Sequence, residues 1–312
     1  MSASVAQREV APQGIHERSL TYVGCNFCGR QITQGVHNIS RLVKCMECGL
    51  IFVSPRPSLA ELAAQYEAEY FHCDTPVFGG YENYEGDREN ILRTFRRRMP
   101  RVLGGVSKDA RMLDVGCATG MFLEVARESG MKIEGLDLSG FAVEQARKKG
   151  FEVQQGQLGE AGFADGAFAA LSMWDIIEHV TDPQGLLREC NRVLADRGTL
   201  IISTPDAGSW LAWLLGGRWL GFRSLDEHLY FFSRASLSRM LEAAGFEVTD
   251  AFSVGKYLSL SRLITRLRYY TRIGAFLLRH LDRLVPDISL YVNPFDTMCI
   301  VARKRTGSAP RS

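Results

Sequence analysis

The 312-residue chain lacks several features that would assign it to a class at once. No run of about 18 apolar residues is present, so the sequence predicts no membrane-spanning helix. The first residues, MSASVAQREVAPQG, are polar and lack the apolar segment of a secretory signal, which makes the cytoplasm the expected compartment. The formal net charge of +2 argues neither for nor against a nucleic-acid partner.

A disulfide framework is disfavoured by the way the eight cysteines are distributed. Four are scattered, whereas the other four follow the spacing C-x2-C-x16-C-x2-C at Cys25, Cys28, Cys45 and Cys48. Two such pairs are typical of a zinc ribbon, so we expect structural zinc and free thiols. His37 is a weaker rival ligand, and a closed four-cysteine shell predicts no zinc-activated catalysis.

The stretch from Arg111 to Asp137 organises the rest of the sequence. It opens with a short apolar run at 112–115, typical of a buried parallel strand. A tight turn follows at 116–120, and apolar residues at helical spacing then predict a helix. A second apolar strand ends in Asp137, so the stretch predicts one β-α-β unit.

This unit has the features of a nucleotide-binding turn. Glycines let a backbone approach a ligand closely, and a helix N-terminus offers free N–H groups. Asp137 lies 21 residues after Gly116, which suits a carboxylate that accepts hydrogen bonds from a ribose diol. The turn reads G-x-A-x-G with Asp114 before it, whereas NAD-binding proteins use G-x-G-x-x-G. A glycine-rich turn without a ligand is the less favoured alternative.

The G-x-A-x-G pattern resembles motif I of class I S-adenosylmethionine (SAM) dependent methyltransferases. The resemblance, to the type 11/23-like group with an N-terminal four-cysteine zinc ribbon, covers roughly 105–303 and includes E-H-V at 178–180 and H-L-x-F-F-S at 228–233. It implies an α/β fold with a Rossmann-like seven-stranded sheet whose last strand is antiparallel. Similar ribbons precede methyltransferase domains that act on sugars and other small molecules, and also those of ribosomal RNA guanine methyltransferases.

The resemblance implies SAM as the cofactor, bound at the carboxyl edge of the sheet. Asp114 is expected to orient the turn and the amino group of the methionine moiety, and Gln157 to face the adenine amine. Trp174 fits the acceptor mouth and the core equally well. The predicted SAM-binding residues are Asp114, Gly116, Cys117, Ala118, Gly120, Asp137, Leu138, Gln157 and Trp174.

Histidine is the preferred candidate for a base, because its ordinary pKa suits neutral pH. His179 follows the fourth predicted strand, and His228 lies in an insert expected to fold over the same edge. Asp175 and Glu178 are the next candidates. A purely structural histidine is the alternative at both positions.

The expected organisation is a tail at 1–20, a zinc ribbon at 21–57, a helical connector or lid at 58–104, the methyltransferase domain at 105–303 and a tail at 304–312. The insertions at 207–232 and 256–290 are predicted to cover the substrate. The first is rich in tryptophan and the second is amphipathic and basic, so peripheral membrane contact is the rival interpretation. A homodimer contact is a third.

A helix is predicted at 86–104, and its arginines are expected to form a solvated basic face. They are Arg93, Arg96, Arg97, Arg98 and Arg101. A patch for an anionic substrate or RNA is the less favoured interpretation.

The sequence thus favours methyl transfer from SAM to a small-molecule acceptor, such as a sugar, a lipid or a natural-product intermediate. O-methylation with a histidine base is the expected reaction. An RNA methyltransferase that uses the ribbon for recognition is the first alternative, although it predicts a continuous basic surface and the ribbon is only mildly basic. A SAM-binding protein without turnover is the second alternative.

Overall fold

The computed structural model describes residues 20–58, 87–223, 225, 227–264 and 288–306. Four predicted segments lie in large part outside the described residues: the tail at 1–20, the connector at 58–104, the basic insertion at 256–290 and the tail at 304–312.

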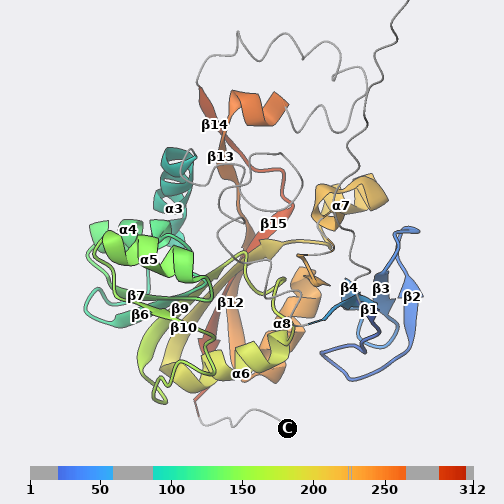
Figure 1. The fold of residues 1–312 in the computed structure, drawn as a ribbon, viewed down its shortest axis with the longest axis horizontal. Helices are drawn as coiled ribbons and strands as arrows, with labels where there is room; N and C mark the ends of the chain where they lie inside the picture. The colour runs from blue at the N-terminus through green and yellow to red at the C-terminus, as the bar shows by residue number, and fades with distance from the viewer. Residues whose placement is uncertain (1–19, 59–86, 224, 226, 265–287, 307–312) are drawn as a thin grey trace, which may run out of the picture.

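A mixed sheet of seven strands forms the centre of the described structure (Figure 1). Its order is β12-β15-β10-β9-β6-β7-β8, and β15 is antiparallel to both of its neighbours. The strands are β6 (Arg111–Val115), β7 (Lys132–Asp137), β8 (Val153–Gln155), β9 (Phe168–Trp174), β10 (Leu194–Pro205), β12 (Phe246–Ser253) and β15 (Thr297–Lys304). The predicted fold class is confirmed.

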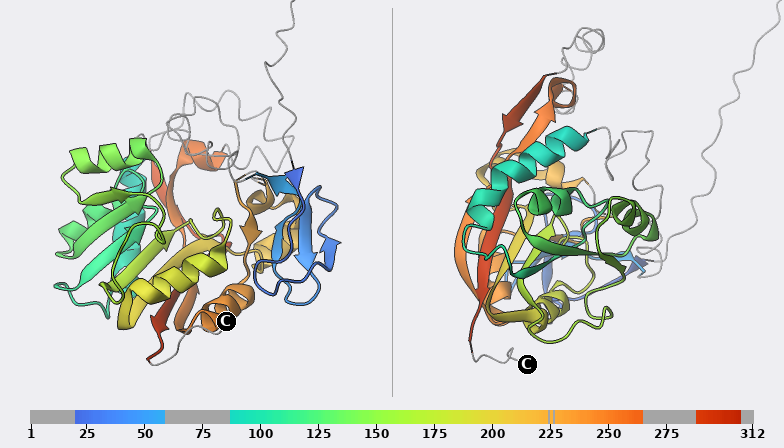
Figure 2. Two further views of the ribbon diagram at one scale, coloured as in Figure 1. Left: turned by 60° about the horizontal axis from the view of Figure 1, so that its bottom comes forward. Right: turned by 90° about the vertical axis from the view of Figure 1, so that its left-hand side faces the viewer.

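Both faces of this sheet are covered by helices, as the views of Figure 2 show. Met112 on β6 packs in one cluster with α3 and α4, whereas its neighbour Leu113 packs in another with α6 and α8. Successive strand residues point to opposite faces, so burial on both sides explains the continuous apolar runs. The helices are α3 (Arg88–Val102), α4 (Met121–Glu128), α5 (Gly140–Lys148), α6 (Pro183–Val193) and α8 (Arg234–Ala243).

Side-chain caps begin three of these helices. Ser139 accepts a hydrogen bond from the Ala142 N–H at the start of α5. Asp182 caps α6, which has proline in its first turn, and Ser233 forms a capping box at the start of α8. Each cap satisfies N–H groups that have no partner inside the helix, so the predicted helix starts follow from local chemistry.

The ribbon strands do not form a separate sheet. A four-stranded sheet, β11-β4-β3-β2, combines them with a strand from the insertion at 207–232. Tyr230 on β11 pairs with Phe52 on β4 in antiparallel register. The elements involved are β2 (Thr33–Gly35), β3 (Leu42–Cys45), β4 (Ile51–Val53) and β11 (Tyr230–Phe231), with a separate pair, β1 (Leu20–Thr21) and β5 (Arg56–Pro57).

Side chains reinforce this junction between ribbon and methyltransferase domain. Phe52 is fully buried in the same apolar cluster as Leu229 and many residues of the central sheet. Asn26 donates a hydrogen bond of 2.9 Å to the Asp182 carboxylate, and Arg239 donates one to the Cys48 carbonyl. The ribbon is therefore part of the same packed core as the domain it precedes.

The rest of the insertion divides into a buried and an exposed half. Trp219 is buried, donates a 3.1 Å hydrogen bond to Asp296, and packs with Phe222 in the cluster that contains Leu42 of the ribbon. In contrast, Trp210, Trp213 and Leu214 on α7 are exposed. The elements are α7 (Trp210–Leu215) and two short 3-10 helices, η2 (Gly216–Arg218) and η3 (Leu220–Phe222).

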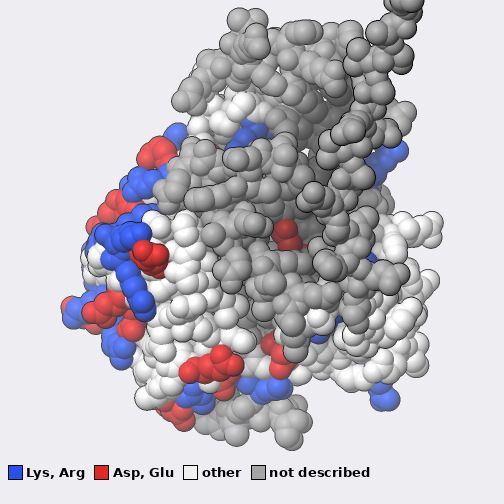
Figure 3. Space-filling view, viewed as in Figure 1, with Lys and Arg blue, Asp and Glu red and all other residues white. Residues whose placement is uncertain are grey.

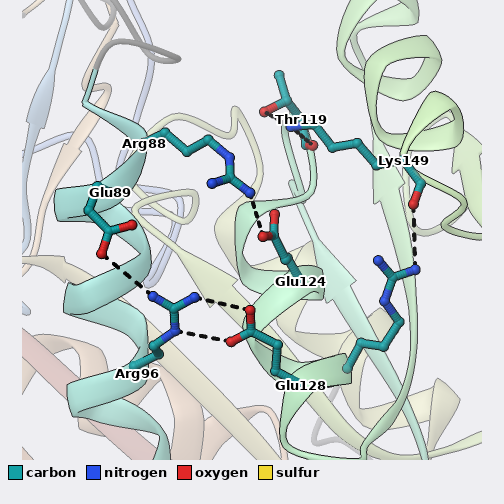
Figure 4. Close-up of polar contacts among 8 residues, drawn as sticks. Arg88, Glu89, Arg96, Thr119, Glu124, Glu128 and Lys149 are labelled. Atoms are coloured by element: carbon teal, nitrogen blue, oxygen red, sulfur yellow. Dashed lines mark hydrogen bonds and ion pairs between the residues drawn. The ribbon is translucent and has the colours of Figure 1, made fainter.

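The predicted solvated face of α3 is present in part: Arg96, Arg97 and Arg101 are exposed, whereas Arg93 is half-buried and Arg98 is buried. Guanidinium groups of Arg93 and Arg97 lie over the rings of Tyr257 and Tyr291, each 4.1 Å from the ring centroid. Arg96 forms a two-pronged ion pair with Glu128 of α4 (Figure 4). These contacts attach α3 to α4 and to a hairpin of β13 (Lys256–Ser259) and β14 (Ser289–Val292), so the exposed arginines also have aromatic and acidic partners that the sequence did not predict.

We expect Phe52→Ala to destabilise the whole described fold and not the ribbon alone. Loss of a fully buried phenyl group costs about 3–5 kcal/mol of unfolding free energy, and this ring lies in a shared core. Urea unfolding should show one transition at a lower midpoint. Met46→Ala, at a side chain that is 55% exposed on the same ribbon, is the control and should change little. Two separate transitions for Phe52→Ala would contradict a shared core.

Candidate active site

The glycine turn lies between the carboxyl end of β6 and the start of α4. Gly116 has φ of +76°, and a Cβ atom there would lie 2.2 Å from the Ile176 side chain. Gly120, with φ of +86°, is the N-cap of α4, and no side chain caps that helix. The first N–H groups of α4 are therefore placed to receive an anionic group.

Asp137 ends β7 and spans this turn. Its Oδ2 accepts a hydrogen bond of 2.8 Å from the Ala118 N–H, and its Oδ1 accepts one of 2.9 Å from the Ser139 N–H. Burial raises the pKa of the carboxyl group, and these backbone donors oppose the shift. Each oxygen keeps a further lone pair, so the carboxylate can accept two more hydrogen bonds at the sheet edge.

Asp114 and Cys117 are buried beside the turn. The Ser172 hydroxyl donates a 2.5 Å hydrogen bond to Asp114, yet burial raises the pKa of this carboxyl group to about 8. The Cys117 thiol packs among apolar side chains that include Val143, and burial raises its pKa as well. Both buried side chains thus lie on the core side of the glycine turn.

Asp175 follows β9 at the same edge and has a left-handed backbone, with φ of +55°. Lys256 lies 3.2 Å from its carboxylate, and the Ser203 hydroxyl donates a 2.9 Å hydrogen bond. Burial opposes ionisation, but the charges of Lys256 and Arg98 outweigh it and hold the pKa below its usual range. A carboxylate that is ionised and ion-paired is a weak base, which favours a positioning role.

His179 and His228 lie side by side, with ring centroids 4.7 Å apart and rings at 88°. A backbone hydrogen bond of 2.8 Å from the Leu229 N–H to the Glu178 carbonyl holds the two segments together. Burial lowers the pKa of His179 to about 3 and that of His228 to about 4, so both imidazoles are neutral at pH 7. The structure brings the two predicted histidines together at one place.

The four ribbon cysteines form a compact cluster. The Sγ atoms of Cys25 and Cys48 are 3.4 Å apart, and those of Cys28 and Cys45 are 3.5 Å apart. Two thiolates on a tetrahedral zinc with bonds of about 2.3 Å would lie about 3.8 Å apart, so the cluster fits that ion. His37 packs against Phe222 instead of joining the cluster, which disfavours it as a ligand.

Residues 84–251 match the family described as "Methyltransferase domain", which is more than half of the chain. This chain belongs to that methyltransferase family. A curated relative from Mycolicibacterium smegmatis, named a probable S-adenosylmethionine-dependent methyltransferase, is 31% identical over 111 residues. The match covers 36% of this chain and 41% of that relative, so this chain matches less than half of the relative's length.

Solved structures support the same fold. A chain of the complex between the Haloferax volcanii Trm112 methyltransferase activator and its proposed methyltransferase has a TM-score of 0.53 at 19% identity, covering 71% of this chain and 93% of that one. A SAM-dependent methyltransferase from Archaeoglobus fulgidus has a TM-score of 0.49 at 20% identity, covering 70% of this chain and 94% of that one. The family match and the Haloferax volcanii chain confirm the predicted class I methyltransferase fold.

The residues of this methyltransferase fit SAM at the glycine turn. Asp137 offers acceptors for a ribose diol, and the uncapped start of α4 suits the carboxylate of the methionine moiety. Gly156, which precedes Gln157, borders open space, and the side chains of Leu138 and Gln157 are exposed beyond β7 and β8. The individual SAM contacts stay predictions, but the turn has the required donors and acceptors.

Trp174 belongs to an aromatic cluster in the methyltransferase core. Its ring centroid lies 5.2 Å from that of Phe95 and 4.9 Å from that of Phe122. Its indole N–H is buried and has no hydrogen-bond partner among the described residues. The packing favours the core over the acceptor mouth. A hollow of about 340 Å³ beside β7 and β8, lined partly by Glu134 and Arg147, contains none of the predicted site residues.

Several supporting residues were missed by sequence reasoning. Ser172 and Ser203 hold the carboxylates of Asp114 and Asp175, and Lys256 reaches Asp175 from another part of the chain. A polar residue inside each buried strand was a usable signal for the two serines. Nothing local marks Lys256, because its partner lies 81 residues away in the sequence.

We expect Asp137→Asn to weaken SAM binding by roughly tenfold or more, because a hydrogen bond to a charged group is worth about 1.5–3 kcal/mol. Isothermal titration calorimetry measures the change. Asp165→Asn removes a charge at an exposed side chain elsewhere and should bind SAM as the wild type does. Equal affinity of Asp137→Asn and wild type would remove Asp137 from the donor site.

Proposed function

We propose that this protein transfers a methyl group from SAM to a hydroxyl of a small-molecule acceptor, such as a sugar, a lipid or a natural-product intermediate. The contact between Gly116 and Ile176 carries this proposal. Ile176 lies between Asp175 and His179, so the segment bearing the acceptor-side candidates packs directly on the donor turn. Donor and acceptor groups thus share one sheet edge, where open α/β sheets bind ligands.

Bound SAM supplies a methyl group on a positively charged sulfur. The chain must hold the acceptor oxygen about 3–3.5 Å from that methyl carbon and manage the acceptor proton. His228 is our first candidate for the proton, followed by His179 and Asp175. Both imidazoles are neutral at pH 7 and can accept a proton, although burial makes them weak bases.

A small-molecule acceptor fits the surface better than RNA does. On the face shown in Figure 3, lysine and arginine side chains over α3 to α5 are interleaved with aspartate and glutamate. Four arginines of α3 lie over aromatic rings, and Arg96 forms an ion pair, so they do not form a phosphate-binding stripe.

The ribbon also supports a structural role over nucleic-acid recognition. It shares a sheet with β11, and β11 directly follows His228 and Leu229. The Haloferax volcanii neighbour was solved with a separate activator. We infer that the ribbon, with a structural zinc ion at its four cysteines, supports the catalytic edge from within the same chain.

A cytoplasmic protein with peripheral membrane contact is part of this proposal. Among the described residues, no helix combines the length and apolar character needed to cross a bilayer. Trp213 and Leu214 on α7 are 81% and 62% exposed, and Trp210 is 56% exposed. Exposed tryptophan suits the boundary between lipid headgroups and acyl chains, so α7 supports contact with a lipid surface.

Transfer of labelled methyl groups tests the reaction itself. Wild-type protein and Asp137→Asn would be incubated with methyl-labelled SAM and separated pools of sugars, nucleotide sugars, lipids, natural-product intermediates and RNA. The proposal predicts label in one of the small-molecule pools, strongly reduced for the variant. Label in RNA alone would favour the RNA alternative, and SAM binding without any label would favour a non-catalytic SAM-binding protein.

We expect His228→Ala to lower kcat by about 100-fold, the lower end of the usual contribution of a positioned acid or base, while the Kd for SAM stays the same. The reason is that His228 lies on the acceptor side and not in the glycine turn. His37→Ala, at an exposed histidine of the ribbon, is the matched control. Unchanged kcat for His228→Ala would leave the histidine with a structural role only.

We expect a Trp210→Ala, Trp213→Ala double variant to bind phospholipid vesicles at least about 100-fold more weakly than wild type, since each buried aromatic side chain contributes on the order of 1.5–3 kcal/mol. Vesicle flotation measures the effect. Ile32→Ala, at a side chain that is 70% exposed on the ribbon, is the control. Absence of wild-type flotation would exclude the lipid surface as the partner of α7.

A further inference from the structure

Three side chains of the acceptor edge are arranged as metal ligands usually are. One potential ligand atom from each of Glu178, His179 and His228 lies within 4.8 Å of the others. They come from two chain segments joined by the backbone hydrogen bonds from Leu229 and Tyr230 to the Glu178 carbonyl. The cluster is therefore held by the fold and not by one flexible loop.

Two side chains of this cluster, Glu178 and His228, have buried polar atoms without a hydrogen-bond partner among the described residues. Glu178 is 1% exposed, and neither of its carboxylate oxygens makes a hydrogen bond of normal geometry within the described residues. The Thr204 hydroxyl lies close enough to lower the pKa of this group, but burial and Asp175 outweigh it. Nδ1 of His228 is also buried with no described partner. Unpaired buried groups of this kind are costly, and a bound ion is one way to satisfy them.

The surroundings of the two histidines match those of ligating imidazoles. The backbone of Glu227 lies in hydrogen-bonding contact with His179, and that of Gly221 with His228. Ligating histidines commonly donate one ring N–H to such a carbonyl, which leaves the other nitrogen for the ion. Both imidazoles are neutral, the form that binds metals.

Charges of both signs lie near the cluster, and Lys256 is close enough to influence both Glu178 and His228. Glu178 lies near the ionised Asp175, whose positive neighbours are Lys256 and Arg98. A divalent ion would let Glu178 ionise in its buried position. Two ligands on one ion with bonds of about 2.1 Å are at most about 4.2 Å apart, so closing the shell needs a shift on the order of half an ångström.

We propose that Glu178, His179 and His228 bind one divalent transition-metal ion of the borderline class, such as Zn²⁺, Mn²⁺ or Fe²⁺, whose remaining positions take an oxygen of the acceptor. Two imidazoles and one carboxylate are a donor set of such sites with open positions. The inference rests on the proposed function for the role of the ion, but the binding does not require methyl transfer. A ligating imidazole is not a free base, so the ion would polarise the acceptor hydroxyl in its place.

Metal content of the full-length protein tests the site. The wild type and the variants Glu178→Gln, His228→Ala and His37→Ala would be purified from media supplemented with zinc, manganese or iron, and analysed by plasma mass spectrometry. The wild type should contain one equivalent of metal beyond that held by the four cysteines. Glu178→Gln and His228→Ala should lose that equivalent, and His37→Ala should keep it.

Two further measurements distinguish loss of the metal from misfolding, and the proposed site from the four-cysteine site. SAM affinity, measured by calorimetry, reports whether each variant is folded, because none of the three proposed ligands lies in the glycine turn. Cobalt substitution of the wild type should give the visible bands of a nitrogen and oxygen site in addition to the thiolate bands of the ribbon. A single equivalent in every medium, with thiolate bands alone, would overturn the metal site and leave the proposed methyl transfer standing.

Discussion

The hydrogen bonds that the Asp137 carboxylate accepts from Ala118 and Ser139 set the geometry of the donor site. They join the turn after β6 to the start of α5, so the two ends of the β-α-β unit cannot separate. The same carboxylate lies at the carboxyl end of β7, where a ribose would be bound. Because Gly116 packs on Ile176, the position of this turn also sets that of the acceptor segment.

The second constraint is the junction between the ribbon and the acceptor edge. The segment around Glu178 is hydrogen-bonded to Leu229, and β11, which includes Tyr230, pairs with β4 of the ribbon. The four-cysteine module, far from the glycine turn in sequence, is therefore joined through two short strands to the segment that contains His228.

Local patterns were sufficient for most of the sheet. Apolar runs, caps such as Ser139 and Asp182, and the glycine turn each predicted the element that the structure contains. The features that local patterns did not predict depend on partners distant in sequence. Arginines of α3 lie over aromatic rings of β12, β13 and β14, and β11 pairs with a strand of the ribbon. The proximity of His179 and His228 was expected only because both were assigned to one sheet edge, whereas the role of Lys256 had no local signal.

The claim on which the account depends is that the Asp137 carboxylate binds the ribose diol of the donor. Calorimetry of the wild-type protein with S-adenosylhomocysteine and with its 2′-deoxy analogue tests it most directly. We expect one binding site per chain for S-adenosylhomocysteine. The 2′-deoxy analogue should bind roughly tenfold more weakly, because it loses a hydrogen bond to a charged group. Equal affinity for both compounds, or no binding of either, would contradict it.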